Sequence, residues 1–150
     1  EASLFVSTTG SDADFVVKLI DVNPNKMDSA VGEPNRGAQQ TLVRGEPFRA
    51  RFRDSLEQPK AMQPNEVHSV KFAINDVMHT FKRGHRIMIQ VQSSWFPFID
   101  RNPQKYVENI YQAKDSDFIK ANHRLYRGAG KLSRLQVQVL PALDDSLNAK

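Results

Sequence analysis

The chain has 150 residues, of which 39% are hydrophobic and 25% are charged, and its formal net charge is +4. That length fits one domain with its own core, and the lysines and arginines are scattered among acidic residues, which argues against nucleic-acid binding. The absence of cysteine excludes disulfides, thiolate zinc sites and cysteine nucleophiles. No apolar segment approaches the roughly 18 residues that a membrane span needs, so we expect no membrane contact.

The first quarter of the chain reads as strand, turn and strand. Leu4 and Val6 alternate with Ser3, Phe5 and Ser7, which predicts a strand with one buried face, and the opening shows no signal peptide. Residues 8–14, TTGSDAD, have turn chemistry. Residues 15–22 are apolar on both faces except for Lys18, as in a strand at the middle of a sheet. A long polar loop is expected over residues 23–40.

Strands continue to dominate the rest of the sequence. The patterns predict strands over residues 48–54, with three arginines on one face, over residues 67–74, and over residues 133–141 as the closing strand. Residues 79–81 and 86–92 are expected to pair as a hairpin around KRGH, with Gly84 at positive φ.

Only residues 106–126 have any helical character, and it is weak. About eight short strands at even spacing, without a βαβ rhythm, predict an all-β antiparallel β-sandwich or jelly roll. Residues 1–141 would form this domain, and residues 142–150 would be a flexible tail.

No nucleophile or metal site stands out. Ser93 and Ser94 lack the flanking glycines of a nucleophile elbow, and we expect them to end a strand. The four histidines (His68, His79, His85 and His123) have no zinc-binding spacing, so we expect no metal. Calcium at GSDAD is an open alternative, although Asp12 and Asp14 fit turn caps better.

Two adjacent aromatic residues, Trp95 and Phe96, leave the strand of residues 86–92 together. Such a pair is either part of the core or part of an interface, and the sequence favours neither. Asp100 and Arg101 follow in the same loop, and we expect them to bind separate partners.

Four segments carry a family resemblance: DADFVVKLIDV, RARFR, VKFAINDVMHTFKRGHRIMIQVQSSWFP and DRNPQ. Together they resemble the C-terminal domain of the X-Pro dipeptidyl-peptidase and cocaine-esterase type hydrolases, most closely the α-amino-acid ester hydrolases and glutaryl acylases. The resemblance runs over residues 2–141. It implies a jelly roll resembling galactose-binding domains, attached to upstream α/β-hydrolase and cap domains that carry a Ser-His-Asp triad.

The resemblance also implies that this chain lacks the first strand or strands of the domain and holds no catalytic residue and no cofactor. Trp95 and Phe96 are then the candidates for a substrate pocket or a domain interface. For the parent enzyme it implies export, to the periplasm or beyond. A homo-oligomer is left open.

Two functions therefore compete. The first is a non-catalytic β-sandwich that helps to wall the active site of a serine hydrolase acting on ester or amide bonds. The alternative is a carbohydrate-binding module, because jelly rolls and exposed aromatic pairs often bind sugars.

Overall fold

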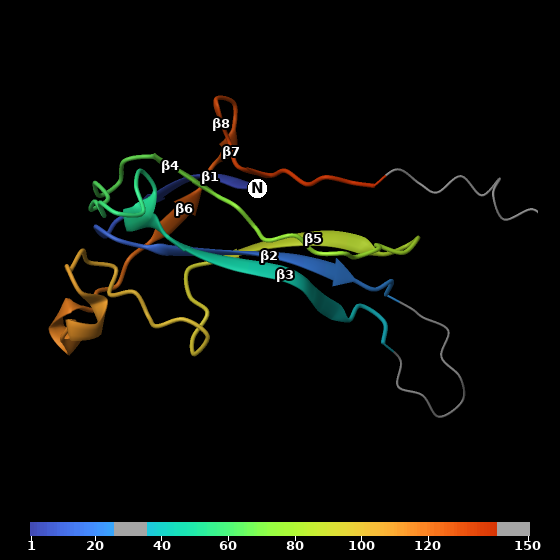
Figure 1. Cartoon of the computed structure of the whole chain (residues 1–150), viewed down its shortest axis with the longest axis horizontal. Helices are drawn as coiled ribbons and strands as arrows, with labels where there is room; N and C mark the ends of the chain where they lie inside the picture. Colours follow the sequence, from blue (N-terminus) through green and yellow to red (C-terminus); the bar gives the residue numbers. More distant parts are fainter. Residues whose placement is uncertain (26–35, 141–150) are drawn as a thin grey trace, which may run out of the picture.

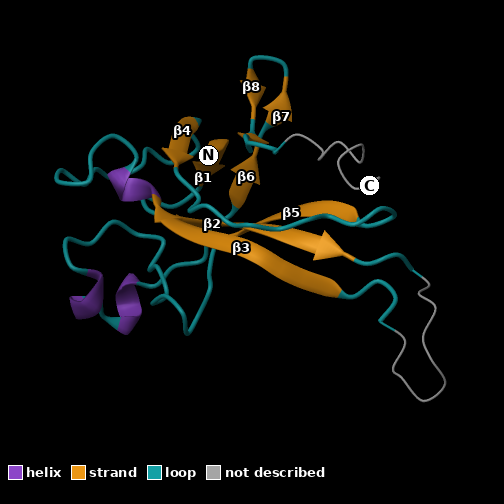
Figure 2. Cartoon of the chain, turned by 45° about the vertical axis from the view of Figure 1, so that its right-hand side comes forward, coloured by secondary structure: helices purple, strands orange, loops and turns teal. Residues whose placement is uncertain are grey.

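The computed structural model describes residues 1–25 and 36–140, which form two antiparallel sheets packed face to face (Figures 1 and 2). The first, sheet A, has the order β4-β1-β6, and β9 also pairs with β1; the second, sheet B, has the order β3-β2-β5. The strands are β1 (Ala2–Thr8), β2 (Asp14–Val22), β3 (Gln40–Arg49), β4 (His68–Phe72), β5 (Arg86–Gln92), β6 (His123–Leu125), β7 (Arg127–Gly128), β8 (Lys131–Leu132) and β9 (Arg134–Leu135). The described part contains no α-helix, only the 3-10 helices η1 (Ala50–Phe52), η2 (Ile110–Gln112) and η3 (Asp115–Asp117).

The core lies between the two sheets. Leu4 and Val6 of β1 are buried there together with Phe15 and Val17 of β2, and Met62 from a connecting loop fills the same cluster. Because side chains on a strand alternate between faces, the intervening residues Phe5 and Val16 belong to the outer faces of the two sheets. The predicted all-β antiparallel sandwich is thus confirmed.

β6 and β9 together behave as one interrupted strand beside β1. β6 pairs with residues 6–8 of β1, and β9 pairs with residues 2–3. The β7–β8 hairpin leaves the sheet between them and projects from the body of the molecule (Figure 1). Tyr126 anchors the base of this hairpin, because its backbone N–H donates to the Phe5 carbonyl.

Three sequence predictions are corrected by the structure. The strand predicted over residues 48–54 ends at Arg49, and η1 follows, because Arg51 turns inward to a buried carboxylate. Residues 79–81 form no strand, and β5 pairs with β2 instead, although Gly84 has the expected positive φ of 85°. Of the closing strand over residues 133–141, only β9 pairs with another strand in the described part of the chain. Part of the predicted loop over residues 23–40 and the predicted tail lie outside the described residues.

A buried ion pair joins the first turn to η1. The Arg51 guanidinium donates to Asp12 at 2.9 and 2.5 Å, and both side chains are almost fully buried. Arg51 also donates to the Val107 carbonyl at 2.7 Å and lies over the Tyr106 ring. This one side chain therefore holds together three segments that are distant in the sequence.

We predict that Arg51→Met lowers the free energy of unfolding by about 3–5 kcal/mol, because methionine keeps the apolar stem but leaves the Asp12 carboxylate buried without its cationic partner. Urea denaturation measures this loss. The matched control is Lys71→Met, which removes an exposed pair with Glu1 at 3.2 Å and should cost less than about 1 kcal/mol. Equal losses in the two variants would contradict the structural role of Arg51.

Candidate functional site

The aromatic residues that follow β5 lie on the outer face of sheet B, opposite sheet A. In Figure 1 the loop that carries them, yellow in the colour bar, descends from sheet B on the side away from β1 and β4. We call Trp95, Phe96, Phe98 and Phe118 the aromatic patch. The first three belong to the loop, and Phe118 follows η3.

Trp95 is seated against the sheet by two neighbours. Lys18 of β2 places its ammonium 4.1 Å from the centre of the Trp95 ring, a cation–π contact. Gly45 of β3, which lies opposite Lys18 in the register, leaves the space that the indole fills. A Cβ atom at Gly45 would lie 2.7 Å from Cη2 of Trp95, so the absence of a side chain there is required for this packing.

Phe96 and Phe98 present their rings to solvent. Phe98 packs against Trp95 at 4.7 Å between ring centroids, yet it is 69% exposed, and Phe96 is 66% exposed. Arg101 lies between Phe96 and Phe118, with its guanidinium 5.9 and 5.6 Å from their ring centroids. Exposed aromatic rings next to arginine are characteristic of protein interfaces.

The loop is fixed to sheet B by a partly buried network of charged and polar side chains. Arg49, at the end of β3, donates to both carboxylate oxygens of Asp14 at 3.0 and 3.2 Å, and also to Asp100 of the loop at 3.2 Å. Asn102 of the same loop donates to Asp14 at 2.9 Å. The aromatic patch is therefore presented by a loop that is held at both Asp100 and Asn102.

Burial shifts the pKa values of the charged groups in this network. Desolvation raises the pKa of Asp14 above its ordinary value, and the hydrogen bonds from Arg49 and Asn102 offset only part of that effect. Burial alone would lower the pKa of Arg49, but Asp14 and Asp100 raise it. A buried carboxylate of this kind is stable as an anion only while its cationic partner stays in place.

The acidic residues considered for calcium or for turn caps both pair with arginines, and Oδ1 of Asp12 also accepts a hydrogen bond from the Ala13 backbone N–H at 3.0 Å, as a residue that caps the turn would. Asp12 binds Arg51, and Asp14 binds Arg49. Because Oδ2 of Asp12 accepts two hydrogen bonds from Arg51 and both oxygens of Asp14 accept from Arg49, these carboxylates are committed to the fold. In the part of the chain that the structure describes, no group of three or more His, Asp or Glu side chains is arranged to hold a metal ion.

Ser93 and Ser94 follow β5 directly and are exposed, so the prediction that they end a strand is confirmed. Within residues 1–25 and 36–140 no serine, threonine or tyrosine hydroxyl bonds an imidazole. The expected separate partners of Asp100 and Arg101 are also found, namely Arg49 for the first and aromatic rings for the second.

The four histidines lie in three different environments. His79 and His85 share one partner: Nε2 of His79 and Nδ1 of His85 each lie 2.8 Å from a different oxygen of the buried Asp21. His123 packs edge-on against Phe15, and burial lowers its pKa. His68 stays near the Gln63 backbone.

Sequence reasoning named Trp95 and Phe96 as candidates and did not include Phe98, Phe118 and Arg101, which the structure places beside them. The spacing Trp-Phe-Pro-Phe contains a usable signal for Phe98, because a loop that turns at Pro97 can return the next aromatic ring to the first. No local signal links Phe118 to this loop.

We predict that Gly45→Ala displaces Trp95 and shifts its fluorescence emission to longer wavelength, because the new methyl group overlaps the indole. Trp95 is the single tryptophan of the chain, so the signal is specific to this site. The overlap should also cost about 1–3 kcal/mol of stability. Gly128→Ala is the control, since a Cβ there meets nothing within 4 Å. An unchanged emission spectrum in Gly45→Ala would show that the indole is not seated as described.

A second prediction concerns the pH dependence of stability. Burial alone would raise the pKa of Asp21, but its hydrogen bonds to His79 and His85 lower it below the ordinary 3.8. A lowered carboxyl pKa contributes stability above that ordinary value and loses it as pH falls through the lowered pKa. Asp21→Asn should therefore be less stable than the parent chain at pH 6, and the gap should shrink below about pH 4.

Thermal unfolding between pH 6 and pH 3 tests this expectation. Asp76→Asn, at an exposed position, is the control and should follow the parent chain throughout. A gap between Asp21→Asn and the parent chain that stays constant down to pH 3 would contradict the role of these histidines.

No helix within the described ranges is long and apolar enough to cross a membrane.

The comparisons with known proteins point to one family. The model of the X-Pro dipeptidyl-peptidase C-terminal non-catalytic domain matches residues 1–136. Among curated proteins, the cocaine esterase of Rhodococcus sp. (strain MB1 Bresler) is 32% identical over 139 residues, covering 93% of this chain and 22% of the esterase.

Two solved structures are similar in fold and in sequence. An aminopeptidase from the marine sediment archaeon Thaumarchaeota archaeon has a TM-score of 0.82 and 44% identity. An α-amino acid ester hydrolase has a TM-score of 0.82 and 45% identity. In both, the match covers 88% of this chain and 21% of the other.

The chain thus spans only about a fifth of the length of these relatives. All three are hydrolases by name, and they give no support to the carbohydrate-binding alternative. The match of the family model over nearly the whole chain, together with the similarity to the cocaine esterase, establishes that the chain belongs to the X-Pro dipeptidyl-peptidase C-terminal non-catalytic domain family.

Proposed function

We propose that this chain is the accessory β-sandwich of a serine hydrolase that cleaves ester or amide bonds. In this role it packs against the α/β-hydrolase and cap domains of the same polypeptide and helps to wall the active site. The names of the relatives support the reaction class, since they include an esterase, an ester hydrolase and an aminopeptidase. The short span of the match relative to those proteins supports the accessory role.

The observation that carries the proposal is the aromatic patch. Two phenylalanines more than half exposed on an anchored loop leave apolar area in water that an interface would remove. Burial of one such side chain is worth about 1.5–3 kcal/mol. Because Arg49 and Asn102 already fix the loop, little further ordering would be needed when a partner binds.

The charges around the patch fit a protein partner. Lys18 and Arg101 both lie against aromatic rings. Such mixed aromatic and cationic surfaces bind well to a face with apolar pockets and acidic residues at the rim. We assign that face to the catalytic domain, with Trp95 and Phe96 nearest to the substrate pocket.

We predict that the double substitution Phe96→Ala and Phe98→Ala, made in the longer hydrolase, lowers kcat/KM for a nitrophenyl ester about tenfold or more, because interface aromatic residues carry a large share of docking energy. It should also separate a single thermal unfolding transition into two. Leu132→Ala is the matched control, since this exposed residue lies on the β7–β8 hairpin, far from the patch (Figure 1). Unchanged activity and unchanged unfolding in the double variant would remove the patch from the interface.

The isolated chain provides a separate test of the non-catalytic role. It should give no turnover of the same ester, with Ser93 and Ser94 intact. Turnover that disappears in Ser93→Ala or Ser94→Ala would overturn the assignment.

A further inference from the structure

Arg101 is held beside the aromatic patch but has no acceptor for its N–H groups. Its guanidinium lies 5.9 Å from the ring centroid of Phe96 and 5.6 Å from that of Phe118. The residue is exposed, and no hydrogen bond or ion pair joins the guanidinium to any residue in the part of the chain that the structure describes. A guanidinium has five N–H donors, and its planar shape matches a carboxylate through two parallel hydrogen bonds. Arg101 therefore presents unused donors at the surface of the patch.

The backbone on both sides of Arg101 is fixed. Asp100 accepts hydrogen bonds from Arg49 at 3.2 and 3.3 Å. Asn102, which is 6% exposed, donates to Asp14 at 2.9 Å. Because both neighbours are held and two rings flank the guanidinium, little freedom is left for this side chain to lose when an acceptor binds.

Other arginines of the chain show what a guanidinium needs once it leaves water. The side chains of Arg49, Arg51 and Arg53 are 22%, 3% and 9% exposed, and each lies 3.8 Å or less from a carboxylate oxygen. A partner that covers the Phe96 ring also removes water from the guanidinium of Arg101 beside it. A charge buried in this way is costly unless a group of opposite charge accompanies it.

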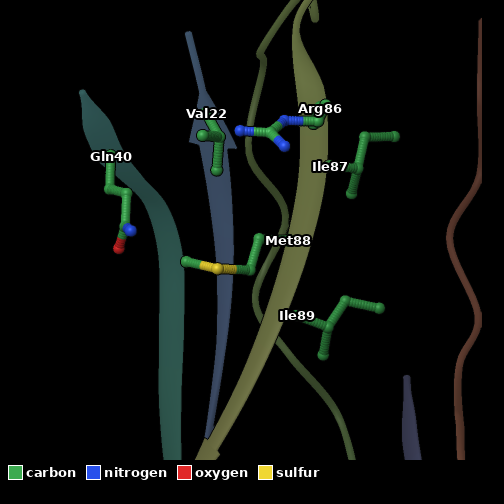
Figure 3. Close-up of a pocket in the computed structure, with 6 residues that line it drawn as sticks. All are labelled: Val22, Gln40, Arg86, Ile87, Met88 and Ile89. Atoms are coloured by element: carbon green, nitrogen blue, oxygen red, sulfur yellow. The ribbon is translucent and has the colours of Figure 1, made fainter. Parts of the chain in front are cut away.

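The sheet beneath the patch supplies no free carboxylate. The side chains that share the outer face of sheet B with Lys18 are Asp14, Val16, Ile20 and Val22 of β2, Gln40, Leu42, Gly45, Pro47 and Arg49 of β3, and Arg86, Met88, Gln90 and Gln92 of β5. Figure 3 shows Arg86 and Met88 on this side of β5, with Ile87 and Ile89 projecting from the opposite side. Asp14 is the one acidic residue in this set, and it binds Arg49. A carboxylate for Arg101 therefore has to come from a partner.

We propose that Arg101 receives one carboxylate, an aspartate or glutamate side chain, from the catalytic domain that the aromatic patch packs against. This inference rests on the proposed function and names the group that the patch selects on its partner. The carboxylate accepts hydrogen bonds from the guanidinium and replaces the water that docking removes. The exposed rings supply apolar area to the interface, and the pair at Arg101 fixes the orientation in which the two surfaces meet.

Carbodiimide crosslinking in the longer hydrolase tests for this carboxylate. Arg101→Lys places an amine at the same site, and a carbodiimide joins an amine to a carboxylate in contact with it, taking up the water that is lost. We expect one crosslink from position 101 to an aspartate or glutamate of the catalytic domain, identified by mass spectrometry of the digested protein. Arg83→Lys, at an exposed position before β5, is the matched control and should give no crosslink to that domain.

Charge reversal measures what the pair contributes. Arg101→Glu in the longer hydrolase should split the single thermal unfolding transition and lower kcat/KM for a neutral nitrophenyl ester by about tenfold or more, because two carboxylates would then face each other. Reversal of the crosslinked aspartate or glutamate to lysine in the same variant should restore most of the loss. The isolated chain with Arg101→Glu should unfold close to the temperature of the parent chain, since Arg101 is exposed there.

Three results would overturn the inference. The first is the absence of any crosslink from position 101 to the catalytic domain. The second is an unchanged unfolding profile and unchanged activity in Arg101→Glu. The third is a higher KM of Arg101→Gln for an ester that carries a carboxylate, with the neutral ester and the single transition unaffected, because the carboxylate would then belong to the substrate.

The double variant Phe96→Ala and Phe98→Ala separates this inference from the proposed function. If that variant splits the unfolding transition and Arg101→Glu does not, the carboxylate inference alone fails. If neither variant changes the transition or the activity, the patch is not the interface, and both proposals fail together.

Discussion

The structure depends on one arginine that satisfies two carboxylates. Arg49 ends β3, and its guanidinium joins Asp14 at the start of β2 to Asp100 in the loop that follows β5. Asp14 is buried and its pKa is raised, so its charge needs this partner and the amide of Asn102. The two salt bridges of this one side chain thereby fix the ends of two strands and the position of the aromatic loop. Their contribution is geometric as much as energetic, because buried pairs gain little net stability over apolar ones.

The pairing of buried carboxylates with cationic partners also explains why these side chains stabilise the fold and do not act as catalytic acids or bases. Catalytic acids and bases must be free to exchange protons with a substrate. Here the buried carboxylates are committed: Asp12 to Arg51, Asp14 to Arg49, and Asp21 to two histidines. The aromatic patch, in contrast, leaves apolar rings exposed at the surface, which suits packing against another domain.

The local sequence pattern correctly predicted the elements that form mainly from the properties of neighbouring residues. Alternation identified β1, continuous apolar character identified β2 as a central strand, and Gly84 identified its turn. The local pattern failed where contacts with residues distant in the sequence determine the backbone conformation. Residues 48–54 look like a strand with an arginine face, but Arg51 leaves strand geometry to reach Asp12, and an apparent hairpin around Gly84 gives way because His79 and His85 both bind Asp21. Tertiary contacts of this kind are not encoded in any short window.

The candidate site likewise combines features that the local sequence predicts with features that depend on distant residues. Trp95 and Phe96 were identifiable because two large aromatics leave a strand together, and that is a local fact. The surface that these residues form could not be predicted from the sequence. It depends on Gly45 and Lys18 in other strands and on Arg101, which joins the loop to Phe118. The polar anchors and the apolar rings therefore have separate tasks. The partly buried pair of Arg49 with Asp100, and the hydrogen bond from Asn102 to the buried Asp14, set the position of the loop. The rings that remain in water define what can bind to it.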